Sequence, residues 1–157
     1  MAQWQTTRFL LDLHSPLIMG IVNNTPDSFS DGGKHRDLDA LRHAEKLVKE
    51  GADILDIGGE STRPGSPAVP EDEEIRRVLP LVKEAVKLGV AISVDTYKPR
   101  VMQAVLDLGA DIINDVWGLR QPGAQDVVAG HPLCGVCIMH MHQTPQNMHL
   151  DHMQGDA

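Results

Sequence analysis

Five short apolar segments, separated by stretches of helical periodicity, constrain the fold of this chain more than any other feature. The segments cover residues 17–22, 53–57, 90–94, 111–114 and 135–139. They are apolar on both faces, which is typical of a parallel sheet covered by helices. A short repeat, GADILD at 51–56 and GADIIN at 109–114, places a helix stop directly before a strand each time. The pattern predicts an α/β fold, either a (β/α) barrel or a doubly wound sheet.

Helical stretches occupy the intervals between the apolar segments. We expect helices over about residues 37–50, 70–88 and 99–108, and a weaker one over 122–130. Asp37 is the expected N-cap of the first helix, and Leu38 belongs to its buried stripe. Pro70 and Pro99 are expected at the starts of the second and third helices, where proline is tolerated.

Polar residues follow the apolar segments and decide between the two architectures. They are Asn23, the loop 58–63, Asp95, Asn114 with Asp115, and Met139 with His140. A (β/α)8 barrel builds its site from the carboxyl ends of all its strands, whereas a doubly wound sheet gathers it at one switch point. The sequence therefore favours a barrel. Such a barrel usually needs about 250 residues, so we expect an incomplete barrel with about the first five βα units.

Composition limits the partners and the location that we expect. The chain has 157 residues, a formal net charge of -8 and no apolar run long enough to span a membrane. It therefore predicts one cytoplasmic domain that binds neither nucleic acid nor membranes. Residues 1–16 form a short entry segment, and residues 140–157 form a polar tail rich in His and Met. An anionic ligand would need local neutralisation by an arginine, a helix N-terminus or a metal.

Two other patterns suggest metal binding but are weak. Cys134 and Cys137 have CxxC spacing without a second pair, so we interpret them as core or rim thiols. His140 and His142 would share a face only in a strand, and no acidic partner is fixed beside them. We interpret the histidines of this tail as part of a polar loop.

The longest motifs carry a resemblance to a known family. The runs MGIVNNTPDSFSDGG, DIGGESTRPG, SVDTYKP, GADIINDV and CIMHM occur in this order. Together they resemble dihydropteroate synthase of the folate pathway over roughly residues 16–148. The resemblance implies a TIM barrel that condenses a dihydropterin pyrophosphate with 4-aminobenzoate, releasing pyrophosphate. It also implies that Mg²⁺ assists, that sulfonamides compete for the aminobenzoate site, and that the full-length form is a homodimer. Residues 1–157 would be the N-terminal part of a single pterin-binding domain.

The resemblance assigns pterin binding to residues at strand ends. Asp95 and Asn114 match the positions that bind the pterin ring, and Met139 matches a position that packs on it. An ionised Asp can accept hydrogen bonds from two N–H groups, and Asn can both donate and accept. These capacities suit a flat heterocycle with a fixed donor and acceptor edge.

Two oxygen-bearing residues match the metal and pyrophosphate positions of the family. Asn23 corresponds to the residue near both, and Asp31 to a loop acid that completes the Mg²⁺ site. Oxygen ligands suit Mg²⁺, which also keeps several waters. Stabilising the departing anion is the main catalytic task. We expect Asn23, Asp95 and Arg63 to be the catalytic residues.

The two long loops supply the remaining matched positions. Thr62 and Arg63 correspond to residues that contact substrate, and Arg63 can bind a phosphate or carboxylate with its guanidinium fork. Phe29 and Pro64 correspond to the apolar residues that flank the aminobenzoate ring. Glycines and prolines in both loops would permit movement on binding.

Departures from the family leave two alternatives open. Asn24 stands where the family often has an apolar residue, and Tyr97 replaces a smaller one. The second pterin carboxylate, a lysine and an Arg-x-His anion site from strands six to eight are missing from the sequence, so the fragment alone is expected to be inactive. One alternative is a pterin-binding methyltransferase domain, although its family should lack both long loops. The other is a non-catalytic truncated homologue.

Overall fold

The computed structural model describes residues 2–25, 33–61 and 65–139. Its centre is a parallel sheet of five strands: β3 (Met19–Asn23), β4 (Ile54–Gly58), β5 (Ala91–Asp95), β6 (Ile112–Asp115) and β7 (Gly135–Ile138). The helices are α1 (Gly33–Lys49), α2 (Glu71–Ala85), which continues into the 3-10 turn η1 (Val86–Leu88), α3 (Pro99–Asp107) and α4 (Ala124–Ala129). Before them stands the antiparallel hairpin of β1 (Gln3–Gln5) and β2 (Leu10–Asp12).

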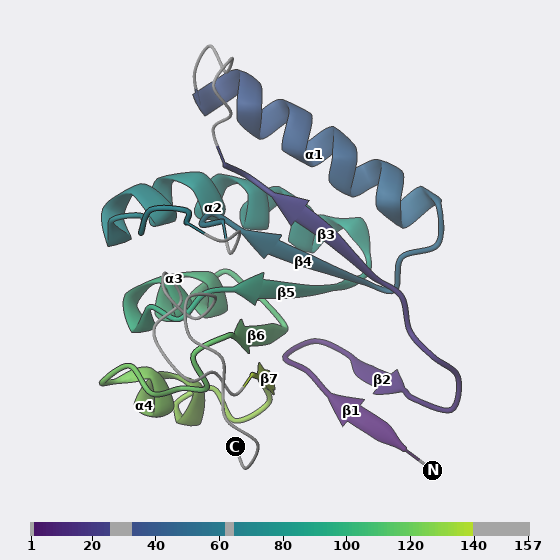
Figure 1. The fold of residues 1–157 in the computed structure, drawn as a ribbon. Coiled ribbons are helices and arrows are strands. Elements are labelled where there is room, and N and C mark those ends of the chain that lie inside the picture. The colour runs from purple at the N-terminus through teal and green to yellow at the C-terminus, as the bar shows by residue number, and fades with distance from the viewer. Residues whose placement is uncertain (1, 26–32, 62–64, 140–157) are drawn as a thin grey trace.

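The order of the strands distinguishes the two predicted architectures. The sheet runs β3-β4-β5-β6-β7, so every strand pairs with the one that follows it in the chain. A doubly wound sheet would reverse direction at a switch point, and none occurs among the described strands. Figure 1 shows the strands fanning in chain order, with their arrowheads at the same end as the start of α1. The sheet is therefore part of a barrel, as the sequence predicted, with four βα units and a fifth strand among the described residues.

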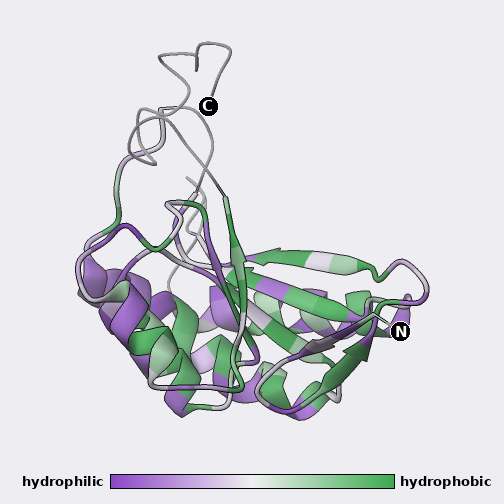
Figure 2. Cartoon of the chain, turned by 90° about the horizontal axis from the view of Figure 1, so that it is seen from below, coloured by the Kyte–Doolittle hydropathy of each residue, from purple (hydrophilic) through white to green (hydrophobic). Residues whose placement is uncertain are grey.

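Helices cover one face of the sheet and give it the larger hydrophobic core. Leu55 and Ile57 of β4, and Ile92 and Val94 of β5, are fully buried against α1, α2 and α3. Figure 2 shows mostly hydrophobic strands beside helices that carry both hydrophobic and hydrophilic segments, as amphipathic helices do. On each strand, every second residue points toward this helical layer, and the residues between them point to the other face of the sheet.

Those alternate residues form two rows on the other face of the sheet. What we name the strand-end row follows the register Asn23–Gly58–Asp95–Asn114–Cys137. What we name the middle row lies two residues earlier on each strand and follows Ile21–Asp56–Ser93–Ile112–Gly135. Since side chains alternate with a period of two, both rows project to the face away from the helices.

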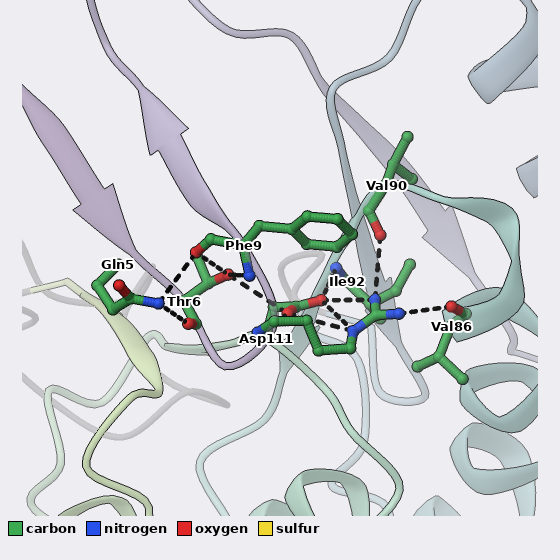
Figure 3. A network of polar contacts seen from close by, with 8 residues as sticks. Gln5, Thr6, Phe9, Val86, Val90, Ile92 and Asp111 are labelled. Atoms are coloured by element: carbon green, nitrogen blue, oxygen red, sulfur yellow. Dashed lines mark hydrogen bonds and ion pairs between the residues drawn. The ribbon is translucent and has the colours of Figure 1, made fainter.

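The β1–β2 hairpin closes the opposite end of this face. Trp4, Phe9 and Leu11 pack with Leu17 and Met19 against Ile54, Ala91 and Ile112. The hairpin is held by Asp111, a fully buried carboxylate that receives the Arg8 guanidinium at 2.7 Å (Figure 3). Asp111 also accepts the backbone N–H groups of Arg8 and Ile92. The sequence predicted a short entry segment over residues 1–16 but not this hairpin.

Most predicted boundaries are confirmed to within two residues, but the start of the first helix is wrong. α1 begins at Gly33, so Asp37 lies inside the helix, where its Oδ1 accepts from Asn24 Nδ2 at 2.7 Å. Leu38 is also not part of the core, because 47% of it is exposed. It lines a groove of about 240 Å³ between α1 and α2, with Leu41 and Pro80. This groove lies on the helical layer and not at the strand ends.

Candidate functional site

The strand-end row brings three predicted site residues together. Asn23 ends β3, Asp95 ends β5, and Asn114 lies one residue before the end of β6. Gly58 separates Asn23 from Asp95, and a Cβ built on it would lie 3.5 Å from Asn23 Oδ1 and 3.6 Å from Asp95 Cβ. Glycine therefore leaves a space bounded by an amide and a carboxylate. This space lies at the end of the strands where barrels bind their ligands.

The Asp95 carboxylate is available to bind a ligand. Its pKa is raised to about 7, chiefly by burial and also by the negative charges of Asp56, Glu74, Asp115 and Glu60. None of the described residues donates a hydrogen bond to it. A carboxylate that is half ionised near neutral pH and lacks donors favours a ligand that brings N–H groups.

Asp56 lies in the middle row, directly before the space at Gly58, and sequence analysis missed it. Only 5% of the residue is exposed. Ser93 Oγ donates to its Oδ1 at 2.8 Å, and Asn114 Nδ2 lies 3.4 Å from both of its oxygens. Burial raises the pKa of Asp56, while the hydrogen bonds from Ser93 and Asn114 oppose that rise. The available signal was an Asp inside an apolar strand, since charged residues are seldom buried without partners.

Asp115, next to Asn114, has a structural role. It lies on the opposite face of β6, is buried, and accepts the backbone N–H groups of Trp117 and Leu119 at 2.8 and 2.9 Å. Burial raises its pKa, and these two hydrogen bonds act against the rise. Its oxygens are occupied in shaping the turn after β6, unlike those of Asp95.

A buried polar cluster fixes the base of the loop after β4. Glu60 Oε1 accepts the backbone N–H of Val69 at 2.6 Å and the Tyr97 hydroxyl at 3.2 Å. Lys98 Nζ lies 3.5 Å from the same oxygen and donates to Glu74 at 2.5 Å. Burial alone would lower the pKa of Lys98, but the hydrogen bond to Glu74 and the nearby acids raise it. The two ends of the loop are thus joined by one carboxylate.

Asn24 plays the corresponding part at the start of the first long loop. It is fully buried, and its Nδ2 donates to Asp37 Oδ1 and to the backbone oxygen of Arg77 at 2.7 and 2.6 Å. Its Oδ1 accepts from Arg36 Nε at 3.2 Å. The asparagine noted as a departure from the resembled family therefore connects β3 to α1 and α2.

The remaining predicted site residues are placed less completely. Met139 follows β7, is 40% exposed, and donates its backbone N–H to the Asp115 carbonyl. Phe29, Asp31, Thr62, Arg63 and Pro64 lie outside the described residues, as does the tail 140–157. Their roles stay predictions.

Asn23 is the predicted Mg²⁺ ligand that the structure describes. Within residues 2–25, 33–61 and 65–139, no group of three His, Cys, Asp or Glu side chains could hold a metal. Asn23 nevertheless presents an exposed amide at the end of β3. Mg²⁺ commonly takes one or two protein oxygens beside phosphate and water. Cys134 is half-buried and Cys137 is exposed, and they do not form a disulfide with each other.

Comparison with known proteins agrees with this geometry. The profile of the family described as pterin binding enzyme matches residues 19–157. The chain belongs to this pterin-binding family. The match begins at the first residue of β3 and includes every strand of the parallel sheet. It leaves out the β1–β2 hairpin.

Individual members of the pterin-binding family are similar over nearly the whole chain. The dihydropteroate synthase of Neisseria meningitidis serogroup C is 52% identical over 151 residues, 94% of this chain and 53% of the relative. The structure of Burkholderia cenocepacia dihydropteroate synthase complexed with 7,8-dihydropteroate is 54% identical, with a TM-score of 0.82, over 94% of this chain and 49% of that one.

A third family member, Yersinia pestis dihydropteroate synthase in a sulfonamide drug complex, is 44% identical, with a TM-score of 0.86. That match covers 98% of this chain and 57% of the other. The chain thus spans about half the length of the relatives that it matches. Among its described residues, no helix has the length and apolar character needed to cross a bilayer.

Proposed function

We propose that this chain supplies the N-terminal half of a dihydropteroate synthase barrel. The observation that carries the proposal is the strand-end row, in which Asp95 and Asn114 share a row with Gly58 and present oxygens to which no described residue donates a hydrogen bond. The similarity to enzymes of this name, at about half identity, supports the same assignment. The substrates are a dihydropterin pyrophosphate and 4-aminobenzoate.

The chemistry is a substitution at the methylene carbon of the pterin. The amine nitrogen of 4-aminobenzoate forms a C–N bond to this carbon, the C–O bond to pyrophosphate breaks, and the amine loses a proton. Asp95 and Asn114 hold the ring through its N–H groups, so that the methylene is oriented toward the loops. The pyrophosphate departs with the electron pair of the broken bond.

The residues of the two long loops, together with Asn23, would neutralise the negative charge of the pyrophosphate leaving group. Mg²⁺, when bound, supplies positive charge to the pyrophosphate oxygens. Asn23 and Asp31 would hold it, and Arg63 would add a second positive group. Thr62, Phe29 and Pro64 would contact the aminobenzoate, which is also where a sulfonamide would compete. The complete enzyme is a homodimer in this proposal.

Complementation tests the proposed function. The chain is expressed with the C-terminal half of the Neisseria meningitidis synthase, and dihydropteroate formation is measured with both substrates and Mg²⁺. We expect turnover in the complemented sample and none from the 157 residues alone. A folded, complemented barrel without turnover contradicts the proposed function. Turnover by the chain alone contradicts the need for the second half.

A binding experiment distinguishes this function from the related methyltransferase. The chain is titrated with dihydropterin pyrophosphate plus Mg²⁺ and, separately, with methyltetrahydrofolate. We expect heat of binding with the pyrophosphate only. Binding of methyltetrahydrofolate alone would favour the methyltransferase, and binding of neither would favour a non-catalytic partner subunit.

A further inference from the structure

Asp56 of β4 and Asn114 of β6 contact each other across the single strand β5 that lies between them. Asn114 Nδ2 faces the Asp56 carboxylate, 3.4 Å from each oxygen. Between their strands lies β5, whose Ser93 donates to Asp56 Oδ1 at 2.8 Å. Ser93 thus fixes the carboxylate on one side while Asn114 approaches from the other. The three side chains, buried Asp56 and Ser93 with half-buried Asn114, form one hydrogen-bonded group in the floor of the site.

This contact determines which end of the Asn114 amide is free. An ionised carboxylate only accepts hydrogen bonds, so it must face the NH₂ group of an amide and not its oxygen. A rotated amide would set its oxygen against two carboxylate oxygens in a buried place, where such repulsion is strong. Asn114 Oδ1 is therefore turned away from Asp56, and no described residue donates to it.

We propose that Asp56 is a positioning residue that orients the Asn114 amide so that its oxygen accepts a ring N–H of the ligand. The site then requires a donor at that point of the heterocycle, which makes Asp56 a determinant of ring specificity. The inference rests on the proposed function for the identity of the ring. The orientation of Asn114 in the free protein does not depend on that identity.

If Asp56 only stabilised the fold, replacing it would lower the melting temperature. A positioning role predicts that the fold keeps its stability while the ligand contact is lost. A buried carboxylate is costly to desolvate, and Asp56→Asn removes that cost by putting a neutral group of the same shape in its place. In Asp56→Asn, the new amide oxygen can still accept from Ser93, whereas its NH₂ group no longer favours one orientation of Asn114. We expect the melting temperature of Asp56→Asn to equal or exceed that of the wild type. The ligand contact should be lost without loss of the fold.

The orientation is tested first without ligand, by NMR of the ¹⁵N-labelled chain. The wild type should show one set of Asn114 side-chain amide signals with cross-peaks to the Asp56 methylene protons. Asp56→Asn should show a second set from the rotated amide. Asp53→Asn is the matched control, since it makes the same change at the other end of β4, where Asp53 accepts the Ile18 N–H. Absence of the wild-type cross-peaks, or an unchanged single set in Asp56→Asn, overturns the inference.

Calorimetry then measures the consequence for binding. Dihydropterin pyrophosphate with Mg²⁺ is titrated into the wild type, Asp56→Asn and Asp53→Asn. Loss of an oriented, charge-supported hydrogen bond predicts about tenfold to hundredfold weaker binding for Asp56→Asn, and less than twofold change for Asp53→Asn. Equal affinity of the wild type and Asp56→Asn overturns the inference and leaves the proposed function standing. If the wild type shows no heat, the proposed function fails, and the NMR result decides the inference alone.

Discussion

At the scale of single residues, Gly58 determines how much room lies between Asn23 and Asp95. Its neighbour Gly59 has a different role, because a Cβ there would lie 2.8 Å from Val78 Cγ2. The first glycine keeps space for a ligand, and the second permits close packing of α2 on β4. Two adjacent glycines in one motif thus serve binding and folding separately.

Substitution of the two glycines should separate these roles. In Gly58→Ala the new methyl group meets its neighbours at ordinary contact distances, so we expect the thermal melt to change little. It would occupy the ligand space and reduce the affinity for dihydropterin pyrophosphate at least tenfold. Gly59→Ala should lower the free energy of unfolding by about 1–3 kcal/mol through overpacking. Calorimetry and urea unfolding check both variants, and tight binding by Gly58→Ala would contradict this use of the space.

The raised pKa of Asp95 predicts how stability depends on pH. The pKa of Asp95 in the folded protein, about 7, exceeds the ordinary value of 3.8 for an aspartate. The neutral form is thus favoured by folding, and its stabilising contribution is complete below pH 4 and lost as the pH rises through 7. Asp95→Asn stays neutral throughout. It should therefore gain roughly 2–4 kcal/mol over the wild type at pH 8 and nothing at pH 4. Urea unfolding at both pH values measures this, and a gain independent of pH would contradict it.

At the scale of elements, the hairpin depends on one buried ion pair. Asp111 is fully buried, and Arg8 donates to it through Nε and Nη2. The same guanidinium donates to the backbone oxygens of Val86 and Val90 (Figure 3). One side chain therefore joins the hairpin to the end of α2–η1 and to the start of β5.

Removing this arginine should loosen the hairpin. Arg8→Ala leaves the Asp111 carboxylate with fewer partners in a buried place, and we expect a loss of about 2–4 kcal/mol in unfolding free energy. Arg8→Lys keeps the charge but not the fork, and should recover part of the loss. Hydrogen exchange of the β1 and β2 amides checks where the loss occurs. Equal protection in the wild type and Arg8→Ala would show that the pair does not hold the hairpin.

The elements also show what could be predicted from the sequence. The five strands and the starts of α2 and α3 followed from apolar periods, Pro70 and Pro99. The start of α1 did not, since Asp37 has the chemistry of a cap but bonds to Asn24 from inside the helix. The hairpin was missed because its strands have three residues each, too few for a period.

Within the site, Asn23, Asp95 and Asn114 were predicted because each stands at a strand end. Their alignment in one row was not predictable, since register depends on the packing of the whole sheet. Asp56 was not predicted, for a related reason. Its partners Ser93 and Asn114 lie 37 and 58 positions away in the sequence.

At the scale of the whole molecule, β3 and β7 are the two edges of the described sheet. β7 carries Val136 and Ile138 at 38% and 60% exposure on the side where the other strands pack against helices. Unpaired edges with exposed apolar side chains favour association between chains. The same edges are the surfaces that the second half of a barrel would cover.

The open edge predicts concentration-dependent association of the isolated chain. We expect Ile138→Lys to reduce the associated fraction in sedimentation velocity at least twofold, because a charged side chain opposes edge pairing. Leu133→Lys is the control, since Leu133 is 54% exposed but lies before β7. An equal effect of both lysines would indicate a general charge effect and not the edge. In the complemented barrel the second half covers this edge. Neither substitution should then alter association through other surfaces of the barrel.

The hairpin has a practical consequence for engineering. It lies at the amino ends of the strands, across the sheet from the row that contains Asp95 and Asn114. The contacts of the hairpin and the predicted ligand-binding row therefore lie at opposite ends of one sheet. Variants of the hairpin can be screened for melting temperature alone, with little risk of selecting against binding. Half-barrels made heat-resistant in this way would be durable donors for recombining pterin-binding barrels from different organisms.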